Sequence, residues 1–123
     1  MKPDISIVIP LYNEANNVAP LHARLIEAVG ALGTPCEIVY VDDGSGDETF
    51  ANLQAVASTD KRVVLIRFRR NFGQTAAIAA GVKQATGDII ILMDADLQND
   101  PDDIALLIDK MHKGYDVVSG WRR

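Results

Sequence analysis

The chain has 123 residues, which suits one domain rather than two, and 48% hydrophobic with 24% charged residues is ordinary for a protein with a real core. Its formal net charge of −5 argues against a general nucleic-acid binder, since such proteins need a basic surface. A single cysteine, Cys36, excludes an internal disulfide, and no stretch approaches the roughly eighteen apolar residues of a membrane span.

Strand-like and helix-like patterns alternate along the chain. The predicted strands are, in chain order, 5–11, 37–41, 63–68, 88–93 and 116–119. A first helix is expected after a cap at Asn16 or Asn17, with an end at Gly30 and Gly33, and a second after a cap at Ser45 or Asp47. Two more helices are expected over 75–85 and from Pro101 to about residue 113. This alternation predicts a doubly wound, mostly parallel α/β sheet.

Polar side chains follow every predicted strand. In open α/β sheets, ligands bind outside the carboxyl ends of the strands. The residues there are Tyr12 and Glu14 after the first strand, Asp42 and Asp43 after the second, 69–74 after the third, 94–98 after the fourth, and Arg122 after the fifth. Loops are polar in general, so any one of these segments is also explained as a solvated loop. Five of them on one rim favour a binding site.

Asp94 and Asp96 form the sharpest motif of this rim. Residues two apart in an extended backbone point to the same side, and the small Ala95 between them leaves room for a ligand. Two carboxylates suit Mg²⁺ or Mn²⁺, which complete their coordination with water and substrate phosphates. The alternative is a solvated acidic turn. Zinc is not expected, because His22 and His112 lie within predicted helices, where we expect them at the surface.

Asp42 and Asp43 follow the second strand, where a carboxylate can accept hydrogen bonds from a base or a ribose. The first turn contains neither the glycine-rich dinucleotide motif nor a Walker lysine loop, so phosphates are not held in either of those ways. Tyr12 is either a stacking platform for a base or a partly buried loop aromatic. The arginine run 67–70 is either a phosphate-steering group or a solvated edge.

These motifs resemble those of the family 2 glycosyltransferases of the GT-A fold, and in particular the polyprenyl-phosphate branch. The resemblance spans nearly the whole chain, and several motifs occur in the same order. The segments that bear it are 8–14, 41–49, 70–74, 86–88, 93–98 and 117–120, followed by Arg122.

The resemblance implies a site for a nucleotide diphosphate sugar and a divalent cation, Mg²⁺ or Mn²⁺. It implies that the nucleoside is held by Pro10, Tyr12, Glu14, Val41 and Asp43. It also implies a group around the metal and the diphosphate, consisting of Asp94, Ala95, Asp96 and Gln98, with Asp94 and Asp96 as metal ligands, Asp96 as the catalytic residue and Arg122 on the donor phosphates.

For the whole enzyme, the resemblance implies inversion at the anomeric carbon, a polyprenyl phosphate acceptor and a place at the cytoplasmic face of a membrane. Residues 1–123 are then expected to be the nucleotide-sugar-binding GT-A domain, incomplete at its C-terminal end. A polysaccharide acceptor and a nucleotide-binding fragment without activity remain alternatives. An exposed last strand is able to pair with another chain, so a homo-oligomer is also open.

A phosphorylation-switch receiver domain would have a similar length and charge. It requires an acidic pair after the first strand and an aspartate after the third. Tyr-Asn-Glu at residues 12–14 and Arg-Phe-Arg-Arg at residues 67–70 match neither requirement.

Overall fold

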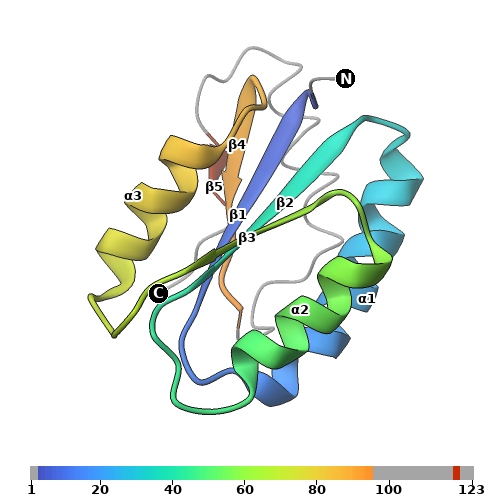
Figure 1. Ribbon diagram of the computed structural model, residues 1–123. Helices are drawn as coiled ribbons and strands as arrows, with labels where there is room; N and C mark the ends of the chain where they lie inside the picture. Colours follow the sequence, from blue (N-terminus) through green and yellow to red (C-terminus); the bar gives the residue numbers. More distant parts are fainter. Residues whose placement is uncertain (1–2, 96–117, 120–123) are drawn as a thin grey trace.

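The computed structural model describes residues 3–95 and 118–119, which form a parallel sheet flanked by helices (Figure 1). In chain order the elements are β1 Ile5–Leu11, α1 Ala15–Leu32, β2 Cys36–Asp42, α2 Thr49–Thr59, β3 Val63–Arg67, α3 Gln74–Gln84, β4 Ile89–Leu92 and β5 Val118–Ser119. The strand order is β3-β2-β1-β4-β5, and every pairing is parallel. The predicted doubly wound fold is therefore confirmed. The helix expected from Pro101 lies outside the described residues.

The two faces of the sheet pack against different helices. In β1, Ile5, Ile7 and Ile9 share one core cluster with residues of α1 such as Leu21, whereas Val8 belongs to a second cluster with Ala77 of α3. Figure 1 shows α3 on one side of the sheet and α1 with α2 on the other. Because β1 is covered on both faces, all seven of its residues are buried, which explains why its sequence is apolar except for Ser6.

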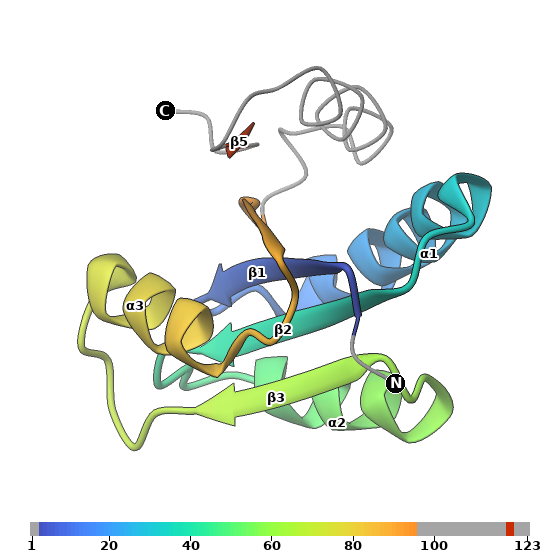
Figure 2. The same ribbon diagram turned by 90° about the horizontal axis from the view of Figure 1, so that it is seen from above.

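Strands β2 and β3 lie on one side of β1, and after β3 the chain crosses to the other side, where β4 pairs with β1. β1 pairs with β2 on one side and with β4 on the other, so that Ile5 lies opposite both Cys36 and Ile89. Figure 2 shows the arrowheads of β1, β2 and β3 at the same edge of the sheet. The strand order therefore reverses between β1 and β4. In a parallel sheet, such a reversal leaves a crevice at the carboxyl ends of the two strands.

The helix ends differ in part from the predicted ones. α1 begins at Ala15 with Glu14 at the N-cap position, and neither predicted asparagine caps it. The Asn17 side chain instead donates a hydrogen bond to the Glu14 carboxylate, over 2.6 Å. At the other end Gly33 adopts the left-handed conformation with φ 66°, as expected for a helix stop, while Gly30 lies inside the helix.

The second helix also begins later than its predicted caps suggest. α2 starts at Thr49, and Asp47 accepts a hydrogen bond from the Thr49 backbone N–H over 2.9 Å. Across the described ranges 3–95 and 118–119, none of the helices combines the length and the apolar character needed to cross a bilayer.

Candidate functional site

A hollow of about 160 Å³ lies in the crevice between the carboxyl ends of β1 and β4. It is lined by Pro10, Leu11, Tyr12, Glu14, Asp43, Gln74, Asp94 and Ala95. All the predicted site residues of the first loop contribute to it, together with Asp43 and the start of the Asp-x-Asp motif. Segments far apart in the sequence thus meet at the point that the sheet topology selects for a ligand.

The other predicted site residues do not line this hollow within the described part of the chain. Val41 is fully buried and packs in the core cluster on the α3 side of the sheet. Asp96, Gln98 and Arg122 lie outside the described residues. Their roles in binding and catalysis stay predictions.

Asp43 ties the end of β2 to the turn that follows β3. Its carboxylate, which is 4% exposed, accepts hydrogen bonds from the backbone N–H groups of Phe72 (2.8 Å) and Gly73 (3.1 Å) and from the Asn71 side chain (2.9 Å). An ionised carboxylate has about four acceptor positions, so these donors occupy most of them. The Asn-Phe-Gly part of the sequence motif therefore serves to fix one wall of the hollow.

Gly44 permits the close approach of these two loops. Its φ is 68°, and a Cβ atom there would lie 2.1 Å from the carbonyl carbon of Arg70. We expect Gly44→Ala to lower the free energy of unfolding by about 2 to 4 kcal/mol, because the substitution strains the backbone and forces two main chains apart. Urea denaturation measures this change.

Gly46→Ala is the matched control for that substitution. No heavy atom lies within 4 Å of the Cβ position of Gly46, and the residue is exposed. We expect its effect to stay within about 0.5 kcal/mol. Equal effects of the two substitutions would contradict the assigned role of Gly44.

The loop after β1 is held by the segment between β2 and α2. The Asn13 backbone N–H donates to the Ser45 hydroxyl oxygen over 2.9 Å, and the Asn13 side-chain oxygen accepts from the Gly46 N–H over 2.8 Å. The Glu14 N–H donates to the Thr49 hydroxyl oxygen over 2.9 Å. These bonds hold Tyr12 and Glu14 at the hollow. The sequence did not predict this positioning role of Ser45 and Thr49.

Asp42 also binds the segment between β2 and α2. It is fully buried, and its Oδ1 accepts a hydrogen bond from the Ser45 N–H over 3.1 Å. Of the two adjacent aspartates, Asp43 is the one whose side chain lines the hollow.

The charge of the hollow favours a cation. Its lining includes the carboxyl groups of Glu14, Asp43 and Asp94, and among the described residues neither a lysine nor an arginine contributes to it. An anionic diphosphate would be repelled there unless a cation accompanied it. Within residues 3–95 and 118–119, no three histidine, cysteine, aspartate or glutamate side chains stand close enough together to hold a metal ion. Carboxylate oxygens and an incomplete protein ligand set suit Mg²⁺ or Mn²⁺, whose coordination a bound phosphate completes.

The Thr86-Gly87 motif lies at the opposite end of the strands. Glu37 accepts hydrogen bonds from the Thr86 N–H (2.7 Å) and hydroxyl (2.9 Å), and the Gly87 N–H donates to the Ser6 hydroxyl oxygen (2.8 Å). Burial alone would raise the pKa of Glu37, but these bonds and one from Ser6 lower it below its ordinary value. This motif joins β1, β2 and β4 at their amino ends, away from the hollow.

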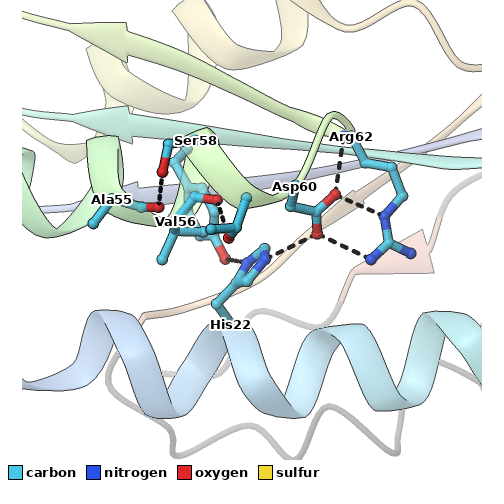
Figure 3. Close-up of polar contacts among 8 residues, drawn as sticks. His22, Ala55, Val56, Ser58, Asp60 and Arg62 are labelled. Atoms are coloured by element: carbon cyan, nitrogen blue, oxygen red, sulfur yellow. Dashed lines mark hydrogen bonds and ion pairs between the residues drawn. The ribbon is translucent and has the colours of Figure 1, made fainter.

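The surface position expected for His22 is wrong. His22 is 5% exposed, and its ring nitrogens contact the Tyr40 hydroxyl (2.6 Å) and the Asp60 carboxylate (3.0 Å). Figure 3 shows Asp60 between His22 and Arg62, and the Arg62 guanidinium donates a hydrogen bond to each of the two carboxylate oxygens. This network lies between α1 and the turn before β3 and belongs to the core.

Residues 6–123 match the family described as Glycosyl transferase family 2. Among curated proteins, the chain is 43% identical over 116 residues to the undecaprenyl-phosphate 4-deoxy-4-formamido-L-arabinose transferase of Pectobacterium atrosepticum, covering 94% of this chain and 36% of that protein. It is 46% identical over 129 residues to the transferase of the same name from Pseudomonas aeruginosa, with 97% and 38% covered. The chain thus spans little more than a third of these relatives.

Solved structures agree with this relationship. A Pyrobaculum calidifontis mannosyltransferase, PcManGT, in complex with GDP-Man and Mn²⁺ aligns with a TM-score of 0.64 and 26% identity, covering 78% of this chain and 28% of that one. S. aureus TarS 1-349 in complex with UDP-GlcNAc aligns with a TM-score of 0.62 and 26% identity, covering 91% and 32%. From its sequence match over residues 6–123 and the fold it shares with these transferases, the chain belongs to glycosyl transferase family 2.

Proposed function

We propose that residues 1–123 form the donor-binding domain of an inverting, metal-dependent glycosyltransferase that moves a sugar from a nucleotide diphosphate to a polyprenyl phosphate. The main support is the acidic hollow at the β1/β4 crevice, where Pro10, Tyr12, Glu14, Asp43 and Asp94 meet. The names of the curated relatives support the acceptor, since those proteins are undecaprenyl-phosphate transferases.

In this proposal the nucleoside lies against the first loop. Tyr12 is 49% exposed and lines the hollow, so its ring is available to stack on a base. Pro10 lines the same wall at the end of β1, whereas Val41 would support the site only from the core. Glu14 and the remaining acceptor position of Asp43 would accept hydrogen bonds from hydroxyl or N–H groups of the nucleoside. Gln74 lines the hollow as well and is an additional polar contact.

The diphosphate lies at the Asp-x-Asp end of the hollow. Asp94 and Asp96 would hold Mg²⁺ or Mn²⁺, and a bound divalent ion neutralises the negative charge that develops on the departing nucleotide diphosphate. Ala95 is small enough to leave the phosphates room, and Gln98 and Arg122 are proposed to bind their oxygens. The mannosyltransferase structure that contains GDP-Man and Mn²⁺ supports this arrangement.

The acceptor needs little activation. A phosphate monoester has a second pKa of about 6, so it is already largely anionic at neutral pH. Orientation and charge stabilisation would then supply most of the rate, with Asp96 next to the reacting phosphates. A lipid acceptor places the reaction at a membrane surface, in our proposal the cytoplasmic face.

A nucleotide-binding segment that needs further residues for transfer is the second candidate. It is favoured by one observation, namely that the chain covers 36% of the Pectobacterium atrosepticum transferase. Transfer assays on this chain and on a full-length relative separate the two candidates.

Calorimetric titration of UDP, GDP, CDP and ADP tests the donor site. We expect one nucleotide to bind at least about tenfold more tightly with Mn²⁺ than without it, because the acidic hollow needs the cation to accept a diphosphate. Equal binding with and without metal by a folded sample, or no binding of any nucleotide, would contradict the proposal.

A further inference from the structure

A second hollow lies beside the donor site at the carboxyl end of β3. It measures about 240 Å³ and is lined by Gly44, Ser45, Arg67, Phe68 and Arg69. None of these residues lines the acidic hollow described above. The two hollows are adjacent along the chain, since Asp43 borders one and Gly44 the other.

The charge of the second hollow is opposite to that of the first. Arg67 and Arg69 line it, and the five lining residues include no carboxylate. Both arginines are exposed, and within residues 3–95 neither forms an ion pair with an acidic side chain. Arg62 shows the contrast, because its guanidinium pairs with Asp60 at 2.9 Å. Two arginines at one hollow, without an acidic partner in the described part of the chain, are unusual for a chain of net charge −5.

An aromatic contact restrains one of the two arginines. The Arg67 guanidinium carbon lies 4.4 Å from the centre of the Phe50 ring, which restricts the side chain before any ligand arrives. Arg69 follows two residues later, in the bend after β3, and lines the same hollow. The Ser45 hydroxyl oxygen accepts the Asn13 N–H, and no hydrogen bond donated by this hydroxyl is found among residues 3–95, so its proton is able to donate.

We infer that this arginine hollow binds a phosphate monoester dianion without a metal. Two guanidinium groups match the several acceptor oxygens of a phosphate and neutralise its two charges. A nucleotide diphosphate fits the neighbouring acidic hollow instead, where a cation must accompany it. In the proposed transfer reaction such a dianion has two sources, the phosphate of the polyprenyl acceptor and free phosphate. The assignment to an acceptor rests on the proposed function.

Phosphate binding in the presence of EDTA tests the inference. Inorganic phosphate and farnesyl phosphate are titrated into the 123-residue chain and into Arg67→Gln and Arg69→Gln. We expect each substitution to weaken phosphate binding by about tenfold or more, since each removes one guanidinium group that can donate two hydrogen bonds to phosphate oxygens. Arg24→Gln is the matched control, because it removes an equally exposed charge from α1, and it is expected to bind phosphate like the unaltered chain.

The same variants are titrated with nucleotide and Mn²⁺. Retained nucleotide binding together with lost phosphate binding supports a separate site.

The inference is overturned if the unaltered chain does not bind phosphate, if both arginine variants bind it normally, or if they lose nucleotide binding as well. Arginine-dependent phosphate binding without any metal-dependent nucleotide binding would leave this site standing and refute the proposed donor function. Tighter binding of farnesyl phosphate than of inorganic phosphate identifies the lipid acceptor as the source, and equal binding identifies free phosphate.

Discussion

Replacing Asp94 with asparagine is expected to weaken metal-dependent nucleotide binding by about 100-fold or more, equivalent to about 2.7 kcal/mol. Asp94 lines the acidic hollow at the end of β4, and asparagine keeps the size of the side chain while removing its charge. A neutral amide oxygen is a much weaker ligand for Mg²⁺ or Mn²⁺ than a carboxylate. Calorimetry with the preferred nucleotide and Mn²⁺ measures the loss, and Asp96→Asn is expected to behave in the same way.

The control for Asp94→Asn is Asp4→Asn. Asp4 is exposed and lies just before β1, at the amino ends of the strands, so this variant loses the same charge far from the hollow. We expect its nucleotide affinity to match that of the unaltered chain. Weak metal-free binding should persist in Asp94→Asn, because the nucleoside contacts are intact. If Asp94→Asn bound nucleotide normally in the presence of Mn²⁺, the metal assignment at this motif would be wrong.

The sheet could be predicted from the sequence because its signals are local. The apolar run of β1 was expected over 5–11 and is observed as Ile5–Leu11, and the left-handed Gly33 ends α1 as expected. The carboxyl ends of parallel strands share one edge, so the meeting of Tyr12, Asp43 and Asp94 also followed from the predicted parallel sheet. Periodicity and chain direction were sufficient for these features.

Contacts between distant side chains could not be predicted in this way. The pattern of α1 does not reveal that His22 meets Asp60, because a histidine at that spacing is equally common on a helix surface. Likewise, nothing local shows that the Asp43 carboxylate binds the backbone of residues 72 and 73. The asparagine caps of α1 failed for the same reason, since Glu14 is drawn into the N-cap position by its bond to Thr49.

The buried network around Asp60 predicts a large loss of stability in Asp60→Asn. The Asp60 side chain is 8% exposed and accepts hydrogen bonds from His22 (3.0 Å) and from the Arg62 Nε (3.0 Å), terminal nitrogen (2.9 Å) and backbone N–H (3.0 Å). Asparagine removes the charge that these donors share and turns an N–H group toward one of them. We expect the free energy of unfolding at pH 7 to fall by about 3 kcal/mol. Glu27→Gln, on the exposed side of α1, is the control and should change it by less than about 0.5 kcal/mol.

The same network predicts that acid destabilises the protein in two steps. The bonds from Arg62 lower the pKa of Asp60 to about 2, and burial lowers the pKa of His22 below its ordinary value, although Asp60 opposes this shift. Neutral His22 can accept the Tyr40 proton at Nδ1 and donate from Nε2 to Asp60, so both of its ring nitrogens and the Tyr40 hydroxyl are hydrogen-bonded. For both groups the unfolded chain binds protons at a higher pH than the folded one. Stability is therefore complete above about pH 6.5 and falls as the pH drops.

Urea denaturation at pH 7, 5, 4 and 2 separates the two steps. Between pH 7 and 5 the decrease attributable to His22 should disappear in His22→Gln, which cannot take up a proton. Between about pH 4 and 2 the folded chain loses up to about 2 kcal/mol through Asp60, because the folded carboxyl group resists protonation while the unfolded one accepts a proton. Asp60→Asn lacks this group, so its stability should fall less steeply over that range than that of the unaltered chain. Parallel pH profiles for the two proteins would show that Asp60 does not link the stability of the fold to pH.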